Sequence, residues 1–217
     1  MARVGERPGS AELPEHPLVS VIIPCYDRLD LTKRCLAALA AATDDVEIEL
    51  GLIDNGSTDG TTDYLRSIAG PKCQVHINDA NLNFAGACNQ GLTLAHAPYT
   101  LLLNNDTEVT PGFLTPLLSV LRTQHDVGIV GSKLLYPDGT VQHAGVVLRH
   151  HNPGELLSFD HVYNGWSADA PCVNRLRDLQ VVTAACALLP TELGLRFQGF
   201  DTRFRNSCED VDLCLRM

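Results

Sequence analysis

Apolar and polar residues come in blocks along the first part of the chain, and the spacing of the apolar positions changes from block to block. Residues 18–23 form a β-branched run that ends at Pro24, which predicts a buried strand. Residues 29–43 follow with apolar side chains at helical spacing, which predicts an amphipathic helix. The residues on its apolar face are Leu31, Cys35, Leu36 and Leu39.

The same unit of strand, loop and helix recurs up to residue 106. Further strands are predicted at residues 46–53, 73–77 and 99–103, with helices at residues 61–69 and 84–97 between them. Strands that alternate with helices are typical of a largely parallel sheet with helices packed on it. The fold class is therefore predicted to be α/β.

The rhythm changes after residue 106. A helix is predicted near residues 111–124, and two apolar stretches at 127–136 and 141–149 flank a Pro-Asp-Gly turn. They predict a hairpin or an extension that makes the sheet mixed. Residues 150–176 have weak periodicity and are expected to form a long loop. Residues 178–190 predict a last strand.

The chain ends in a predicted helix with an acidic first turn at residues 207–217. We expect residues 18–217 to form a single domain and residues 1–17, rich in charge, Pro and Gly, to be a flexible leader. Neither this leader nor any other stretch is apolar over the length needed for a transmembrane segment.

Composition and charge narrow the functional classes. Apolar residues make up 45% of the chain and charged residues 19%, as in a globular protein. The net charge of -10 and the lack of a basic run argue against nucleic acid as a partner. The eight cysteines form no C-x-x-C pair, and several lie in apolar segments, so most are expected to be buried thiols of a cytoplasmic protein.

Polar clusters follow each of the first four predicted strands. They are PCYD at 24–27, DNGSTDG at 54–60, NDANLN at 78–83 and NND at 104–106. Because the carboxyl ends of parallel strands meet at one edge, where open α/β sheets bind their ligands, these clusters predict one binding rim.

These clusters, with VTAACALL and EDVDLCLR nearer the end of the chain, occur in an order that resembles a bacterial family-2 glycosyltransferase. The resemblance runs from about residue 18 to the end and is closest to rhamnosyltransferase-like enzymes of surface-polysaccharide and O-antigen assembly. It implies a GT-A fold, which is Rossmann-like, in a catalytic domain that lacks the family's usual C-terminal continuation. It also implies metal-assisted, inverting transfer from a nucleotide-diphosphate sugar donor to a glycan or lipid-linked glycan acceptor, with Mn or Mg as the divalent cation.

By this resemblance Asp54 contacts the base or ribose of the donor, and the backbone around Pro24 and Tyr26 forms the opposite wall. A carboxylate suits this role because it accepts hydrogen bonds from base N–H groups and sugar hydroxyls. The alternative is a local one, in which Asp54 opens an Asx-turn and Ser57 or Asp59 caps the next helix.

The triplet Asn104, Asn105 and Asp106 occupies the position of the family's Asp-x-Asp motif, which holds a cation on the donor diphosphate. Asn104 departs from the motif, so Asp106 is the one carboxylate left in the triplet to bind the metal. The alternative is a polar turn at the end of a strand.

A second departure lies in the loop that the family places beside the nucleotide, where Asn83 stands in place of the usual glycine. Asparagine tolerates left-handed backbone better than most residues, so the turn is expected to survive. Asn89 is a further predicted donor contact, and its alternative role is a helix cap or an amide that bridges parts of the core.

Asp210 matches the family's catalytic aspartate, which takes the proton of the acceptor hydroxyl. Glu209 is the second candidate, and Asp212 is expected to face solvent or to orient its neighbours. The alternative is an acidic helix N-terminus that is stabilised by the helix dipole.

Three further features carry less information. Thr183 to Cys186 correspond to a small-residue segment that the family places near the sugar, although a buried strand explains them equally well. Trp166 stacks on an acceptor sugar or anchors a loop. The histidines are too loosely arranged to indicate ligands; they are His143, His150, His151 and His161.

Two rival functions remain. A sugar-1-phosphate nucleotidyltransferase would need a Gly-rich phosphate loop after the first strand, which residues 24–30 do not provide. A degenerate or truncated transferase domain, kept as a nucleotide-sugar binding or assembly module, would explain Asn83 and Asn104. The joint presence of Asp106 and Asp210 favours an enzyme.

Overall fold

The computed structural model describes residues 18–43, 46–149, 158–205 and 207–217. Six strands form the main sheet, in the order β3-β2-β1-β4-β10-β5. The first four pair in parallel, and β10 runs antiparallel between β4 and β5. The strands are β1 (Val19–Cys25), β2 (Ile48–Asp54), β3 (Cys73–Ile77), β4 (Tyr99–Leu103), β5 (Val130–Gly131) and β10 (Cys186–Pro190). The predicted α/β class with a mostly parallel mixed sheet is confirmed.

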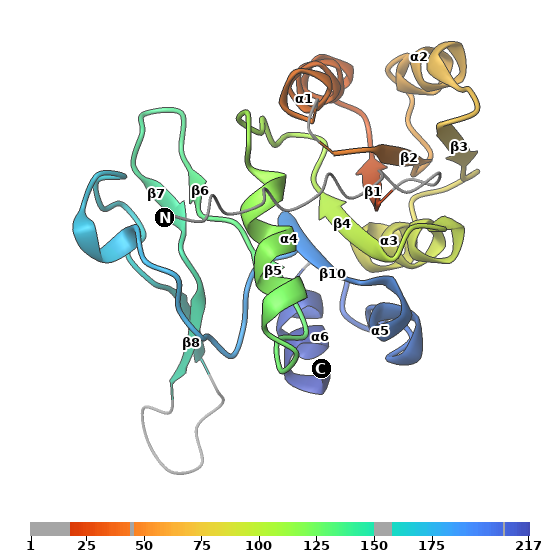
Figure 1. Ribbon diagram of the computed structural model, residues 1–217. Coiled ribbons are helices and arrows are strands. Elements are labelled where there is room, and N and C mark those ends of the chain that lie inside the picture. The colour runs from red at the N-terminus through yellow and green to blue at the C-terminus, as the bar shows by residue number, and fades with distance from the viewer. Residues whose placement is uncertain (1–17, 44–45, 150–157, 206) are drawn as a thin grey trace, which may run out of the picture.

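Helices cover both faces of this sheet, as Figure 1 shows for α1 and α2 on one side of β1 to β3 and α3 on the other. The helices are α1 (Leu29–Ala42), α2 (Thr61–Ile68), α3 (Asn83–Leu94), α4 (Leu114–Thr123), α5 (Thr191–Arg196) and α6 (Glu209–Arg216). Alternate residues of β1 divide between two apolar clusters. Val21 and Ile23 pack with α1, α2 and α4, whereas Ile22 packs with α3 and α6.

Two small antiparallel pairs extend the molecule on the side away from β3 (Figure 1). Strand β6 (Leu134–Leu135) pairs with β7 (Val141–His143), and β8 (Val146–Arg149) pairs with β9 (Ser158–His161). The first pair confirms the predicted hairpin.

The structure corrects three expectations. β9 and a 3-10 turn at Pro171–Val173 lie within the segment predicted as a long loop. The last strand begins only at Cys186, and α5 was not predicted. The leader at residues 1–17, His150 and His151 lie outside the described residues. Within the described part, no helix is long and apolar enough to cross a membrane.

Candidate active site

The loops that leave β1 and β2 are tied together by side chains. The Asp27 carboxylate accepts a hydrogen bond from the backbone N–H of Thr58 (2.7 Å), and the Asp59 carboxylate accepts one from the N–H of Leu29 (2.9 Å). Asp27 and the next residue both have left-handed backbone, with φ of 49° and 59°. Beside them the Tyr26 side chain is 49% exposed, so the expected donor wall is a fixed loop that presents an aromatic ring.

Asp54 lies at the end of β2 but does not face solvent. It is fully buried, and its carboxylate accepts hydrogen bonds from the Ser57 N–H (3.0 Å) and from the Thr62 hydroxyl. This is the Asx-turn arrangement named above as the alternative. A donor contact by Asp54 stays a prediction and would require these bonds to rearrange.

Asn55, which sequence reasoning treated only as part of a turn, organises the loop before α3. Its side-chain NH₂ donates to Asn81 Oδ1 (2.8 Å) and to the Asn83 carbonyl (3.1 Å), and its Oδ1 accepts from the Leu82 N–H (2.9 Å). Asn83 has φ 62°, so the expected left-handed turn is present without glycine. No sequence signal distinguished Asn55 from an ordinary turn residue.

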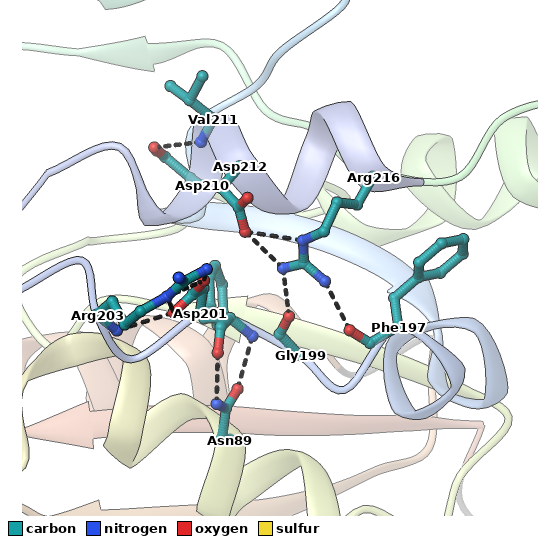
Figure 2. A network of polar contacts seen from close by, with 10 residues as sticks. Asn89, Phe197, Gly199, Asp201, Arg203, Asp210, Val211, Asp212 and Arg216 are labelled. Carbon is teal, nitrogen blue, oxygen red and sulfur yellow. Dashed lines mark hydrogen bonds and ion pairs between the residues drawn. The ribbon is translucent and has the colours of Figure 1, made fainter.

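Asn89 does not point a free amide at the rim. Its NH₂ donates to the Phe200 carbonyl and its Oδ1 accepts from the Phe200 N–H, each at 2.8 Å (Figure 2). Both ends of the amide are therefore engaged by backbone. The structure supports the alternative, an amide that bridges α3 to the segment before α6, over the predicted donor contact.

The side chains of Asn104, Asn105 and Asp106, which follow β4, have three different surroundings. The Asn105 NH₂ donates to Thr32 Oγ1 of α1 (3.0 Å), which anchors the turn. Asn104 Oδ1 is buried and has no hydrogen-bond partner among the described residues. Asp106 is exposed, and within that same part of the chain its carboxylate forms no hydrogen bond or ion pair. An unpartnered amide oxygen and an available carboxylate thus lie two residues apart.

The 182–185 segment contacts both the triplet and α6. The Asn104 N–H donates to the Ala185 carbonyl (2.9 Å), and the Cys214 thiol of α6 donates to the Val182 carbonyl (3.5 Å). The segment therefore connects the triplet, through Ala185, to the last turn of α6, through Val182.

The two candidate bases on α6 have different surroundings. Burial, and then the charge of Asp210, raise the pKa of Glu209, whose Oε2 is buried and has no partner in the described part of the chain. Asp210 is half-buried and accepts a hydrogen bond from the Val211 N–H (2.9 Å). Asp210 is thus held at the first turn of the helix.

Asp212 orients its neighbours, one of the two roles expected for it. Its carboxylate pairs with Arg216 (2.7 Å), and the Arg216 guanidinium also donates to the carbonyls of Phe197 (2.6 Å) and Gly199 (2.7 Å) (Figure 2). Five donors on a rigid plane suit such a clamp. It fixes α6 against the segment that also holds Asn89.

Few protein side chains near residues 104–106 could bind a metal ion. Across the described residues, no three His, Cys, Asp or Glu side chains cluster in a way that could hold a metal ion. The Asp106 carboxylate and the unpartnered Asn104 oxygen are hard oxygen donors of the kind that Mg²⁺ and Mn²⁺ accept. Asp106 is exposed and the Asn104 oxygen is buried, so a cation would meet the carboxylate first and would need the phosphates of a donor as further ligands.

A cavity of about 560 Å³ lies elsewhere, between the β6–β7 region and the end of α6. Its lining includes His143, Val182 and Cys214 but none of the predicted donor contacts. This cavity thus lies apart from the loops assigned to the donor, and it shares Val182 with the 182–185 segment.

Comparison with known proteins identifies the family. The sequence profile described as glycosyl transferase family 2 matches residues 20–179. An O-antigen biosynthesis protein of Myxococcus xanthus, RfbC, is 34% identical over 212 residues, which are 93% of this chain and 16% of that protein. An uncharacterized protein of Sinorhizobium fredii is 33% identical over 93% of this chain and 22% of its own length. The chain thus spans about a fifth of the length of these relatives.

A solved structure gives the same fold. The mannosyltransferase PcManGT of Pyrobaculum calidifontis, solved with GDP-Man and Mn²⁺, superposes with a TM-score of 0.65 at 19% identity, over 94% of this chain and 52% of that one. This likeness supports the GT-A fold. With the profile match and the order of motifs along the rim, it follows that the chain belongs to glycosyl transferase family 2.

Proposed function

We propose that this chain is the catalytic domain of an inverting glycosyltransferase that moves a sugar from a nucleotide-diphosphate donor to a hydroxyl of a glycan or lipid-linked glycan. The observation that carries the proposal is the Asp106 carboxylate in the turn after β4, which is exposed and has no partner among the described residues, and we assign Asp210 in the first turn of α6 to the same reaction. Two relatives add support, since one is named for O-antigen biosynthesis and the fold neighbour was solved with a sugar nucleotide and Mn²⁺.

In this proposal the oxygen of the acceptor hydroxyl attacks the anomeric carbon from the side opposite the diphosphate. The bond between that carbon and the diphosphate oxygen breaks, the nucleoside diphosphate leaves with the electron pair, and Asp210 takes the hydroxyl proton. Glu209 remains the second candidate, because its raised pKa makes it a stronger base once it is ionised.

The donor would lie along the loops after β1, β3 and β4. Tyr26 and the backbone at Pro24 would face the nucleoside, and the turn at Asn83 would approach it from the other side. Asp106, with the Asn104 oxygen, would hold a divalent cation, which when bound neutralises charge on the departing diphosphate. Such a cation would supply positive potential that the summed side-chain charge of -10 lacks.

A calorimetric titration of UDP, dTDP and GDP, with and without MnCl₂, tests the donor site. One nucleotide should bind in the presence of Mn²⁺, and Asp106→Ala should weaken that binding at least about tenfold. Asp63→Ala, which removes an exposed carboxylate on α2, is the matched control and should bind as the native chain does. Binding that ignores both Mn²⁺ and Asp106→Ala would contradict the metal site.

Hydrolysis of the matching nucleotide sugar by water tests the base. Asp210→Asn should lower kcat by about 100-fold or more while leaving the nucleotide affinity unchanged, because the proton acceptor is lost and the donor contacts are not. Glu209→Gln is the comparison. If the native folded chain binds nucleotide but neither hydrolyses nor transfers the sugar, the degenerate binding module is the better description.

We also place the protein in the cytoplasm. All eight cysteines are free thiols, which suits a reducing compartment, and nucleotide sugars are the substrates that the proposal requires. A reporter fusion that is active only when exported would contradict this assignment.

A further inference from the structure

Aromatic side chains gather beside the β6–β7 hairpin, away from the residues assigned to the donor. The rings of Tyr163 and Trp166 meet edge to face, with centroids 5.3 Å apart, and the Arg177 guanidinium lies 4.8 Å from the Tyr163 ring centroid. Tyr136 joins them, because its hydroxyl accepts a hydrogen bond from the Asn164 side chain (3.2 Å). In Figure 1 this segment, drawn in cyan, lies next to β7.

Trp166 is held firmly and yet remains open to solvent. Its carbonyl accepts a hydrogen bond from the Val141 N–H (2.8 Å), its own N–H donates to the Tyr163 carbonyl (3.0 Å), and its side chain is 53% exposed. A tryptophan that served to anchor the loop would bury most of its ring. A rigid, exposed ring is instead a preorganised surface for a ligand.

We propose that Trp166, Tyr136 and Asn164 form a subsite for a sugar residue of the acceptor glycan. A sugar presents C–H groups on the face of its ring and hydroxyls at its edge, so it needs an aromatic surface with hydrogen-bonding groups at the side. Trp166 supplies the surface. The exposed Asn164 and the Tyr136 hydroxyl supply the polar groups, and Gln142 adds another exposed amide.

A chain of contacts connects this subsite to the reaction centre. Val141, which bonds to Trp166, lies two residues before His143 on β7. His143 Nε2 accepts from the Thr183 N–H (3.3 Å), and the carbonyl of Ala185 bonds to Asn104. The path from Trp166 thus runs along β7 and through residues 183–185 before it reaches Asn104. We assign the subsite to an inner residue of a longer glycan, because the sugar whose hydroxyl reacts would lie at the donor.

The surface fits carbohydrate better than a membrane or a protein. Exposed polar side chains at Gln142, Asn164 and Ser167 lie among its exposed aromatic ones, and such a mixture suits a ligand that carries hydroxyl groups. The net charge of -10 disfavours an anionic lipid surface. The inference rests on the proposed function, since only a transferase with a glycan acceptor requires such a subsite.

The chain contains one tryptophan, so its fluorescence reports on Trp166 alone. We would measure acrylamide quenching of the native chain with hexasaccharides of glucose, N-acetylglucosamine and rhamnose, and with the matching monosaccharides. At least one hexasaccharide should shield Trp166, and its monosaccharide at equal concentration should not. By calorimetry Trp166→Ala should weaken that hexasaccharide about tenfold or more, and Trp166→Phe less.

Leu195→Ala is the control, because Leu195 is 45% exposed on α5 and far from the hairpin in sequence. It should leave hexasaccharide binding unchanged. If acrylamide quenches Trp166 as strongly with every hexasaccharide as without one, the proposal is overturned. It is also overturned if no hexasaccharide shields Trp166 but phosphatidylglycerol vesicles or a raised protein concentration do. Metal-dependent nucleotide binding does not involve Trp166, so it should persist in Trp166→Ala and separates failure of this subsite from failure of the donor site.

Discussion

His143 and His161, which are 18 residues apart in the chain, share one hydrogen bond. His143 Nε2 accepts from the Thr183 N–H, so the proton of the neutral ring is on Nδ1. That Nδ1 lies 2.9 Å from Nδ1 of His161 and donates to it. The sequence suggested only loosely arranged histidines, because the pairing of Val146 with His161 that brings them together is not visible in it.

This arrangement predicts a loss of stability in mild acid. Burial, and then the nearby His161, lower the pKa of His143 to about 4, whereas the unfolded residue titrates near 6.5. Between pH 6.5 and 4, His143 binds a proton in the unfolded chain but stays neutral in the folded chain. The free energy of unfolding therefore falls as the pH drops through this range, by up to about 3 kcal/mol. Above pH 6.5 the contribution is constant.

Urea unfolding of the native chain and of His143→Gln between pH 7.5 and 4.5 checks this expectation. The stability difference between the two should narrow as the pH falls, because only the native chain carries the shifted group. Two curves that stay parallel across this window would show that His143 does not titrate as its burial implies.

The asparagines show which properties of single residues could be predicted from the sequence. The left-handed turn at Asn83 was predicted and is present, since it depends on local backbone chemistry alone. The partners of Asn89 were not predictable, because Phe200 lies 111 residues further on. Likewise Asp106 is exposed and Asp54 is buried, although both follow a predicted strand. The position of a residue at the end of a strand does not reveal how deeply its side chain is buried.

At the scale of elements, α3 packs against the sheet with almost no space between. A Cβ added to Gly91 would lie 2.1 Å from Cγ2 of Ile22 on β1. Gly91→Ala should therefore push α3 away from β1 and lower the free energy of unfolding by about 1–3 kcal/mol, despite the higher helix propensity of alanine. Chemical denaturation measures this loss.

Gly70→Ala is the matched control for that substitution. An added Cβ at Gly70 meets no atom within 4 Å, and its backbone is not left-handed, so its stability should change by no more than about 0.5 kcal/mol. If both substitutions change the free energy of unfolding equally, Ile22 must move aside at little energetic cost.

Elements with strong periodicity were predicted closely, and short ones were missed. Strand β3 and strand β4 have the predicted bounds, because their apolar runs end at clear turn signals. β9 lies in a segment whose weak periodicity predicted a loop, and within the described part of the chain it pairs with β8 alone. α5 has six residues and a central glycine, too little for a helical pattern to emerge.

At the scale of the whole molecule, burial separates the thiols into two groups. Cys25, Cys35, Cys88 and Cys186 are buried, and burial raises the pKa of Cys25 and of Cys35 to about 12. The other four are partly exposed. Since the thiolate is the reactive species, the buried group should react slowly with a thiol reagent.

Labelling with dithionitrobenzoate and mass mapping checks this division. The native chain should lose no more than the four partly exposed thiols at pH 8, and all eight should react in guanidinium chloride. Reductant should leave the thermal midpoint unchanged, because no disulfide links the chain. Rapid native labelling of Cys25 or Cys186 would mean that the sheet opens near the donor rim.

The position of β10 has a kinetic consequence. It pairs with β4, a strand that precedes it by a long stretch of chain, and it delivers the 182–185 segment to the triplet. Closing so large a loop costs conformational entropy before the pairing contacts can stabilise it, so pairings of this kind form late in folding. The strands of the parallel half of the sheet are separated by shorter stretches of chain, so they and the loops after β1 and β2 can form earlier. We therefore expect the half of the rim that follows β1 and β2 to assemble in an early refolding phase, and the half that includes residues 182–185 in a slower one.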